Sequence, residues 1–335
     1  MRTTSRRRVA ARAVAAVAAV SLVAACSDNG GTAGGYPDQN ITFVVPFSAG
    51  GPTDTVTRMI AEPMAKELGA KIVVQNKEGA GGTVGAGEVA RAKADGYTVL
   101  MHHIGMSTAP ALYKNLGYKP LEDFETVGLV TEVPMTIVAR KDFAPSTFQD
   151  LVTHVKANAG KVTLANAGIG AASHLCGLLF QHAVGVKLQE VPYQGTGPAL
   201  TDLVGGQVDF MCDQTTNTSG QISAGKVKAY AVTTAQRVKS LPDLPTTAEA
   251  GLPQLQVSVW HGLYVPAGTP PEVVQKLSEA LKKALANQGV IDQMAKLGTA
   301  PVPAEDATPQ AHRAHLDEQL KTWAKVIADA GVKAS

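Results

Sequence analysis

The sequence contains few charged residues, few aromatic residues and three cysteines. Of its 335 residues, 17% are charged, 5% are aromatic and 45% are hydrophobic. This composition is typical of a globular α/β protein that is long enough for two domains, and it argues against disorder outside the termini. No solenoid repeat is apparent, and no set of histidines, cysteines and carboxylates has the spacing of a metal site. We therefore expect neither a metal nor a cofactor.

The N-terminal apolar run, Ala13 to Val23, is too short to be a convincing membrane span and follows a stretch rich in arginine. We predict an export signal over residues 1–25. Small residues directly precede Cys26, as at a bacterial lipoprotein cleavage site, so we expect Cys26 to carry a lipid; ordinary cleavage nearby is the alternative. Residues 5–9 resemble a twin-arginine signal with Val in place of the usual Phe, so both export routes stay open.

Removal of this signal changes the charge of the chain. The first 25 residues hold five of the 30 basic residues and no acid, so the exported chain has 25 basic and 28 acidic residues, a net charge of −3. No basic patch then remains that would favour nucleic acid. An anionic ligand would have to be held by local dipoles rather than steered by net charge.

Two cysteines remain after Cys26. Cys176 falls on a predicted helix and Cys212 ends a predicted strand, and in an oxidising compartment they can form a disulfide. Two buried free thiols are the alternative. A catalytic thiol is disfavoured, because His174 lies two positions from Cys176 and such residues do not face each other on a helix.

Hydrophobic periodicity predicts alternating strands and helices, which is typical of parallel βαβ units. A tether over residues 26–36 precedes two lobes, lobe 1 (37–133 plus 254–335) and lobe 2 (134–253). The C-terminal helical stretches 271–286 and 308–330 are expected to pack back on lobe 1, giving the two crossings of a hinged clamp. Strands are predicted at 41–45, 71–75, 97–102, 136–139, 162–165, 188–191, 208–212, 229–233 and 257–265. Further helices are predicted at 56–68, 88–94, from Ser146, around Cys176 and at 198–204, with a glycine-rich loop at 79–87.

Two distant segments, 44–54 and 164–174, each read as strand, glycine-rich turn and helix start. Glycines let the backbone turn tightly, and the first turn of a helix leaves N–H donors unpaired at the positive end of the macrodipole. Such a corner binds anions. Two corners on different lobes predict a cleft that holds a small molecule by two negatively charged ends.

Side chains that border these corners are candidate ligand contacts. Hydroxyl groups can donate to a carboxylate, whereas Asp54 is expected to cap the helix because a carboxylate offers no donor. In the first corner the candidates are Ser48, Gly51, Thr53 and Asp54, and in the second Asn166, Gly168, Ser173 and His174. The second corner narrowly misses a dinucleotide fingerprint, since its third glycine is replaced by Ser173.

Other candidates follow predicted strands. His102 and His103 are adjacent, so at most one of them faces the cleft as a donor or a wall, and a structural role is the alternative. Tyr193 and Trp260 could stack on a flat ligand, with core or hinge packing equally open for Trp260. Asp213 ends the strand that carries Cys212.

These segments resemble the solute-binding proteins of tripartite tricarboxylate transporters, the Bug family, across nearly the whole exported chain. The resemblance rests on Pro46-Phe47 with Gly50-Gly51 and Asp54, Asn76 with Gly79 to Gly82, Asp95-Gly96-Tyr97, Asn166 to Gly168 with Ser173-His174, Val191 to Tyr193 with Gly195, and Pro242 to Gly251. It implies a two-lobed α/β fold of the type II-like periplasmic binding proteins, in which each lobe is a sheet flanked by helices and a hinged cleft lies between them.

The resemblance also implies a ligand. Family members hold carboxylates with backbone amides and ordered waters at the two corners, and Phe47 and Ala49 become pocket residues through this likeness. Segments 101–106, 209–214 and 257–262 are similar to terephthalate-binding members, which implies an aromatic dicarboxylate; citrate or another aliphatic acid is the alternative.

We therefore expect an exported, lipid-anchored, monomeric receptor that passes a carboxylate to membrane permease subunits. A ligand-loaded partner of a sensor kinase would use the same clamp. An exported enzyme is the third hypothesis, and no strong motif identifies its nucleophile and base.

Overall fold

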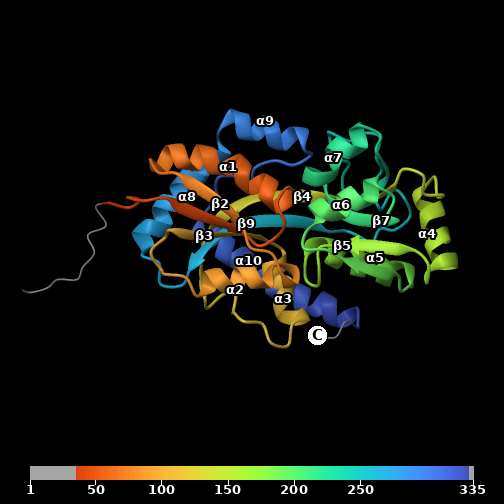
Figure 1. Cartoon of the computed structure of the whole chain (residues 1–335), viewed down its shortest axis with the longest axis horizontal. Coiled ribbons are helices and arrows are strands. Elements are labelled where there is room, and N and C mark those ends of the chain that lie inside the picture. The colour runs from red at the N-terminus through yellow and green to blue at the C-terminus, as the bar shows by residue number, and fades with distance from the viewer. Residues whose placement is uncertain (1–34, 332–335) are drawn as a thin grey trace, which may run out of the picture. The chain divides into compact units, whose positions relative to one another are not determined.

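The computed structural model describes residues 35–331 (Figure 1). The predicted signal and the lipidation site at Cys26 lie outside the described residues. The strands are β1 (Ile41–Val45), β2 (Ile72–Asn76), β3 (Thr98–His103), β4 (Phe124–Arg140), β5 (Thr163–Asn166), β6 (Gln189–Pro192), β7 (Phe210–Gln214), β8 (Val227–Val232) and β9 (Ser258–Pro266). The helices are α1 (Pro52–Leu68), η1 (Ala80–Gly82), α2 (Thr83–Ala90), α3 (Gly105–Leu112), α4 (Phe148–Asn158), α5 (Ala172–Val184), α6 (Thr196–Val204), α7 (Thr215–Ser223), α8 (Pro271–Leu285), α9 (Gln288–Lys296) and α10 (Pro309–Asp329).

The strands form a mixed sheet in the order β2-β1-β3-β9-β4-β7-β5-β6, with β8 also paired to β4. The long strand β4 belongs to both halves of this sheet. It pairs antiparallel with β9 as far as Pro134, and from Met135 onward it pairs with β7 and β8. We call the half with β1, β2, β3 and β9 lobe 1 and the half with β5 to β8 lobe 2. The predicted lobe boundaries, with lobe 2 beginning at residue 134, stay a prediction. The change of strand partners at Pro134 supports them.

Helices cover both faces of each half (Figure 1). In lobe 1, α8 lies against α1, and α10 lies against α3 and β4. Helix α1 shows why the local sequence forms this element: Pro52 occupies its first turn, Val56, Ile60 and Met64 recur at helical spacing and are buried, and Gly69 ends it with φ 69°. No helix in residues 35–331 is long and apolar enough to span a membrane.

Several predicted boundaries were wrong. Helix α2 begins at Thr83, so the expected glycine loop is shorter than 79–87. Gly85 is helical, and its missing side chain matters for packing, since a Cβ there would lie 2.6 Å from the carbonyl oxygen of Lys77. Helix α4 is capped by Thr147 rather than Ser146, because Thr147 and Asp150 form a reciprocal capping box.

Other elements were not predicted at all. Helix α3 contains glycine and proline, α7 is rich in threonine and serine, and the first half of β4 contains Gly128 and ends near Pro134. These residues disfavour regular structure locally. Packing against neighbouring elements overrides that preference, as it does for α7, which contacts β4, β7 and β8.

Candidate functional site

A small cavity lies where the carboxyl ends of β1, β5 and β7 approach one another. Four helices begin at this cavity: α1, α5, α6 and α7, whose N-cap residues are Gly51, Ala171, Gly195 and Gln214. Its volume is about 20 Å³, and its lining residues are Phe47, Gly51, Pro52, Thr53, His103, Ala167, Ala171, Ala172, Ser173, Thr196, Asp213 and Gln214. None of these residues is a lysine or an arginine, so helix N-termini supply the positive potential.

Thr53 and Ser173 line this cavity, one from each predicted corner. The Oγ atom of Ser173 accepts a hydrogen bond from the backbone N–H of Ala167 at 2.8 Å, which leaves its own proton available for a ligand. The Oγ1 atom of Thr53 lies 3.4 Å from Nε2 of His261. Both corners therefore combine backbone N–H groups with one hydroxyl.

Asp54 does not have the predicted role of N-cap. It stands at the third helical position, and the N-cap of α1 is Gly51. Its carboxylate accepts hydrogen bonds from the backbone of Gly50, from Arg58 and from Asn76, all at 2.9 to 3.1 Å. Hydrogen bonds from Arg58, Gly50 and Asn76 outweigh burial and hold the pKa of Asp54 below its ordinary value. Asp54 thus fixes the shape of the first turn and does not line the cavity.

Three buried histidines form one wall with Phe47. His103 lines the cavity and stacks on Phe47 with ring centroids 4.6 Å apart, whereas His102 lies behind, edge-on to Phe47. Nδ1 of His103 accepts the backbone N–H of Gly105. Burial lowers the pKa of His102 to about 4 and that of His261 to about 3, and it lowers the pKa of His103 well below its ordinary value. This wall is therefore neutral at pH 7.

The remaining candidates of the second corner support it from outside the cavity. Oδ1 of Asn166 accepts the N–H of Gly168 at 2.9 Å, and its amide donates to Glu190. Nδ1 of His174 accepts the N–H of Gly170, and Nε2 lies 3.6 Å from Glu190. These side chains hold the glycine turn in place.

Other predicted residues lie elsewhere. The hydroxyl of Tyr193 donates to Asp202 at 2.8 Å, and Tyr193 does not line the cavity. Ser48 and Ala49 are also absent from its lining, although Ser48 is buried and its Oγ has no hydrogen-bond partner among the described residues. Trp260 lines a different hollow.

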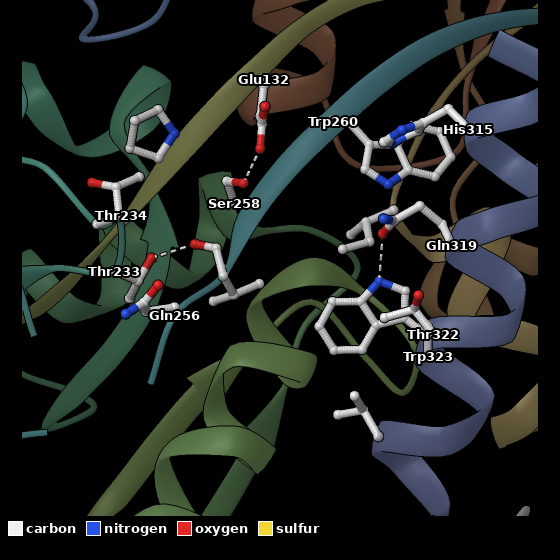
Figure 2. Close-up of a pocket in the computed structure, with 15 residues that line it drawn as sticks. Glu132, Thr233, Thr234, Gln256, Ser258, Trp260, His315, Gln319, Thr322 and Trp323 are labelled. Carbon is white, nitrogen blue, oxygen red and sulfur yellow. Dashed lines mark hydrogen bonds between the residues drawn. The ribbon is translucent and has the colours of Figure 1, made fainter. Parts of the chain in front are cut away.

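That second hollow has a volume of about 690 Å³ and lies where β4 and β9 pass between the lobes. Pro134 and Ser258 line it at this crossing, and Trp260 and Trp323 lie together on the side of α10, opposite Ser258 and Thr233 (Figure 2). The indole nitrogen of Trp260 is buried without a hydrogen-bond partner in the described structure. Trp260 therefore lies beside the crossing of β4 and β9 and not at the small cavity.

The end of β7 supplies a polar wall that the corner argument largely missed. Asp213 is 1% exposed; one of its oxygens accepts a hydrogen bond from Asn217, while Oδ1 has no partner in the described part of the chain. Burial raises the pKa of Asp213 to about 6, and the hydrogen bond from Asn217 and the neighbouring Thr196 hydroxyl and Gln214 backbone N–H oppose this shift in part. Thr196 and Gln214 were not among the predicted site residues. Thr196 opens α6 after β6 and a short turn, the signal used for the other corners, whereas Gln214 ends β7 and is the N-cap of α7 with no turn between them.

Contacts between the lobes enclose the cavity. The hydroxyl of Tyr113 in lobe 1 lies 2.6 Å from the carbonyl oxygen of Ile169 in lobe 2 and 2.8 Å from that of Ala80. On the other side of the cavity, the N–H of Ser48 donates to the carbonyl oxygen of Gln194 at 3.1 Å. The glycine turns thus touch across the cleft.

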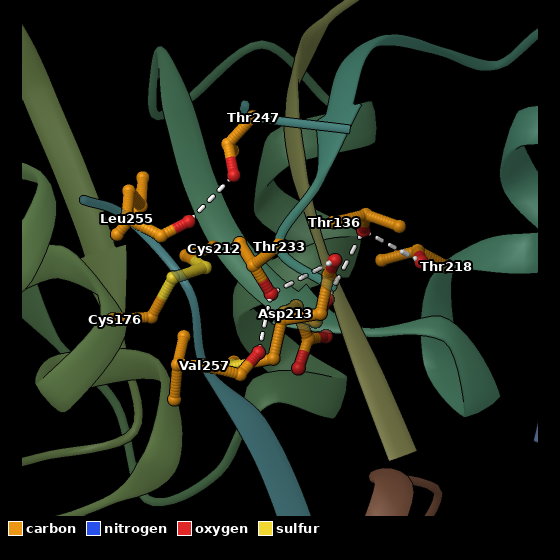
Figure 3. Close-up of a disulfide and its surroundings, with 10 residues drawn as sticks. Thr136, Cys176, Cys212, Asp213, Thr218, Thr233, Thr247, Leu255 and Val257 are labelled. Carbon is orange, nitrogen blue, oxygen red and sulfur yellow. Dashed lines mark hydrogen bonds between the residues drawn. A yellow bond between two sulfur atoms is a disulfide. The ribbon is translucent and has the colours of Figure 1, made fainter. Parts of the chain in front are cut away.

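A disulfide braces the second corner. Cys176 on α5 and Cys212 on β7 are joined, with Cα atoms 6.0 Å apart (Figure 3). Cys212 directly precedes Asp213, whose backbone oxygen accepts a hydrogen bond from Thr136. The disulfide therefore fixes α5, whose N-terminus forms one wall of the cavity, to β7, which carries Asp213 of another wall. Within residues 35–331, no cluster of three or more histidine, cysteine or acidic side chains could hold a metal ion.

A small cavity between two lobes, lined by helix N-termini and polar side chains, defines a solute-binding protein of the periplasmic type. The chain belongs to the receptor family of tripartite tricarboxylate transporters: the model described as "Tripartite tricarboxylate transporter family receptor" matches residues 56–332. This is a family of solute-binding receptors and not of enzymes.

Individual relatives agree with this assignment. A "UPF0065 protein in the TAR-I ttuE-ttuC' intergenic region" of Agrobacterium vitis is 54% identical over 296 residues, 88% of this chain and 86% of that protein. The structure of periplasmic binding protein BugD is 53% identical with a TM-score of 0.88, covering 90% of this chain and all of that one. MatC from Rhodopseudomonas palustris, solved with bound malate, is 41% identical with a TM-score of 0.85. The match covers 87% of this chain and 100% of that one.

Proposed function

We propose that the protein captures a small dicarboxylate outside the cytoplasm and delivers it to the membrane permease of a tripartite tricarboxylate transporter. The convergence of four helix N-termini on one cavity that has no lysine or arginine in its lining carries this proposal. Oriented backbone N–H groups and helix dipoles bind carboxylates without a fixed cation.

The two corners divide the ligand between the lobes. One carboxylate binds at the start of α1 with the hydroxyl of Thr53, and the other binds at the start of α5 with the hydroxyl of Ser173. Because α1 belongs to lobe 1 and α5 to lobe 2, a ligand with two carboxylates holds the lobes together. A cavity of about 20 Å³ has room for roughly one water molecule, so the lobes must separate to admit the ligand.

The spacer between the two carboxylates of the ligand could be aromatic or aliphatic. The stacked pair Phe47 and His103 offers a flat wall, which supports the aromatic, terephthalate-like ligand implied by the sequence resemblance. Tyr193 and Trp260, the other expected aromatic walls, do not line the cavity. This placement and the malate bound by MatC favour an aliphatic spacer.

We also propose that a lipid on Cys26 anchors the receptor as a monomer to the extracytoplasmic side of the membrane. A membrane sensor kinase is the alternative partner, because the same closed clamp would be recognised. Deletion of the gene separates the two roles: loss of dicarboxylate uptake supports transport, while unchanged uptake with lost induction supports sensing.

Calorimetric titration tests the binding function directly. The tag-free exported domain, unfolded and refolded to remove carried-over ligand, is titrated with malate, succinate, terephthalate, benzoate and citrate. We expect dicarboxylates to bind and benzoate, which has one carboxylate, to fail. We expect Ser173→Ala to weaken dicarboxylate binding about 5- to 100-fold, the loss of one buried hydrogen bond to a charged group. No binding of any of these acids would overturn the proposal.

A further inference from the structure

The second corner is supported by a carboxylate that lies outside its strand, turn and helix start. Glu190 is on β6, where it pairs with Leu164 of β5. Its two oxygens face three side chains of neighbouring elements: the amide groups of Asn166 and Gln181 and the ring of His174. Asn166 ends β5, and His174 and Gln181 lie two turns apart on α5. These three residues are buried, whereas the side chain of Glu190 is 32% exposed.

Two of the three side chains hold the glycine turn through their acceptor atoms. Oδ1 of Asn166 accepts the N–H of Gly168 at 2.9 Å, and Nδ1 of His174 accepts the N–H of Gly170 at 3.3 Å. Burial lowers the pKa of His174, against the opposing effect of Glu190, so the ring is neutral at pH 7. A neutral ring whose Nδ1 accepts carries its proton on Nε2. Each side chain therefore turns a donor toward Oε2 of Glu190, Nδ2 of Asn166 at 3.3 Å and Nε2 of His174 at 3.6 Å.

Gln181 follows the same pattern on the other oxygen. Its Oε1 accepts the N–H of Leu188 at 2.7 Å, and its amide donates to Oε1 of Glu190 at 2.9 Å. Glu190 thus faces donors on both sides. An ionised carboxylate is an acceptor at both oxygens, whereas an amide of the same shape has one acceptor end and one donor end. Only a carboxylate at this position satisfies all three neighbours at once.

The turn held by this network aims the start of α5 at the cavity. Gly168 and Gly170 have φ values of 91° and 82°, in the left-handed region that favours glycine. The chain then enters α5 at its N-cap, Ala171. Ala172 and Ser173, the first residues of α5, line the cavity, and the N–H groups of a first helical turn have no partner within the helix. A shift of the turn would therefore redirect the donors that an anion meets.

We propose that ionised Glu190 is a positioning residue of the second anion corner: it fixes the donor direction of its three neighbours and, through them, the glycine turn. Glu190 does not line the cavity. The inference rests on the proposed function, because it assigns a role in binding to the same corner. It also predicts the opposite of simple electrostatics. Removal of a negative charge behind an anion site would by itself tighten the binding of a dianion, whereas loss of positioning weakens it.

The variant Glu190→Gln tests this sign. It removes the charge and keeps the shape, and its NH₂ group must face a donor, either that of Gln181 or those of Asn166 and His174. The refolded, ligand-free receptor and the variant are titrated with malate, succinate and terephthalate in a calorimeter. We expect Glu190→Gln to bind the acids that the wild type binds about 3- to 10-fold more weakly, the loss of one hydrogen bond in the network.

Exchange of the two residues should rescue the loss. In the double variant Gln181→Glu and Glu190→Gln, the amide at position 190 donates to the carboxylate at position 181, whose other oxygen accepts the N–H of Leu188. The net charge equals that of the wild type. We expect the double variant to regain most of the lost affinity. Gln181→Glu alone should bind weakly, because two carboxylates then face each other, and the four proteins form a double-mutant cycle.

Hydrogen exchange separates positioning from a general loss of stability. In the ligand-free receptor, Glu190→Gln should speed exchange at the N–H of Gly168, Gly170 or Leu188, while strands elsewhere in lobe 2 keep their protection. The matched control is Glu122→Gln, which removes an exposed, ion-paired carboxylate of lobe 1. It should change neither the affinity nor the exchange at these three groups.

The outcomes distinguish this inference from the proposed function. Unchanged or tighter binding by a folded Glu190→Gln variant would overturn the role of Glu190 and leave the dicarboxylate function standing. Unchanged exchange at all three N–H groups would also overturn it, as would a double variant that binds no better than Glu190→Gln. No binding of any of these acids by the wild type would overturn the proposed function, and the exchange rates would still decide whether Glu190 holds the turn.

Discussion

The hydroxyl oxygen of Tyr113 lies 2.6 Å from the carbonyl oxygen of Ile169, a contact that joins lobe 1 to the glycine turn of lobe 2. The same hydroxyl lies 2.8 Å from the carbonyl oxygen of Ala80 within lobe 1. One proton can serve either acceptor, so Tyr113 has a partner when the lobes are apart and a second one when they meet. In the closed state the hydroxyl therefore links lobe 1 to the glycine turn of lobe 2 without a ligand atom.

Replacing Tyr113 by Phe should speed the release of ligand. Loss of one interlobe hydrogen bond should raise the dissociation rate about 2- to 10-fold with a smaller effect on association. Stopped-flow measurements with a dicarboxylate that binds provide the test. Tyr118→Phe is the control, because the Tyr118 hydroxyl is buried in lobe 1 without a partner in the described structure. Equal dissociation rates for both variants would contradict the role of Tyr113.

Glycine at position 195 should be required for closure rather than for folding. Its φ of 169° is extended, so the backbone accepts other residues. A Cβ atom there, however, would lie 2.0 Å from Oγ and 2.9 Å from the backbone nitrogen of Ser48, which belongs to the other lobe. We expect Gly195→Ala to melt near the wild-type temperature and to bind dicarboxylate about tenfold or more weakly.

Small-angle scattering shows whether Gly195→Ala stays open when ligand is added. Gly220→Ala is the matched control, since a Cβ at Gly220 has no atom within 4 Å. Full compaction of Gly195→Ala on ligand addition would contradict the prediction.

Tryptophan fluorescence should report ligand binding although neither tryptophan lines the cavity. Trp260 and Trp323 both line the hollow at the lobe crossing, and hinge rotation changes their surroundings. We expect a saturable change in emission during titration, with the calorimetric dissociation constant, and a much smaller change in Trp260→Phe. Binding seen by calorimetry with constant emission would show that the crossing does not move.

Removal of the disulfide should destabilise lobe 2. The bond joins residues separated by 36 positions, and a cross-link of this length contributes about 2–4 kcal/mol to the free energy of unfolding. We expect the double variant Cys176→Ser and Cys212→Ser to unfold at a lower urea concentration and to lose dicarboxylate affinity, because the bond fixes α5 against the strand of Asp213. Reductant should lower the wild-type midpoint to that of the variant and leave the variant unchanged.

Acid should destabilise the folded protein before ordinary carboxylates titrate. The pKa of His102 falls to about 4, and those of His261 and His312 fall to about 3, because burial disfavours the charged ring. The unfolded chain binds these protons below about pH 6.5, so stability is present above that pH and falls by up to about 1.4 kcal/mol per pH unit for each histidine. The raised pKa of Asp213 has the opposite effect: between the unfolded pKa of Asp and about 6, the folded state binds the extra proton and acid stabilises it. This involves one group, against several histidines.

Thermal melts between pH 7 and pH 4.5 measure this slope. His312→Gln should reduce it, since His312 has no hydrogen-bond partner for its ring in the described residues and lies outside the ligand cavity. A melting temperature that stays constant over this range would contradict the burial of neutral histidines.

The two corners of strand, glycine turn and helix start were predictable because their signals are local. A strand, a glycine turn and a helix start within some ten residues determine where backbone N–H groups gather, and Thr53 and Ser173 follow directly. Asp54 shows the limit of this reasoning. Its partners include Asn76, which lies 22 residues away in sequence, so its hydrogen bonds could not be deduced from the helix start.

The sequence by itself determined the α/β class, the positions of most strands along the chain and the two glycine turns, since hydrophobic period and turn chemistry act over a few residues. Tertiary structure alone decided that His103 and Asp213 face one cavity while Tyr193 and Trp260 do not. It also decided that β4 serves both lobes, that α6 and α7 add two further N-termini, and that the glycine turns meet across the cleft. These features depend on contacts between segments 50 to more than 200 residues apart, as in the approach of Thr53 to His261, for which no local pattern carries information.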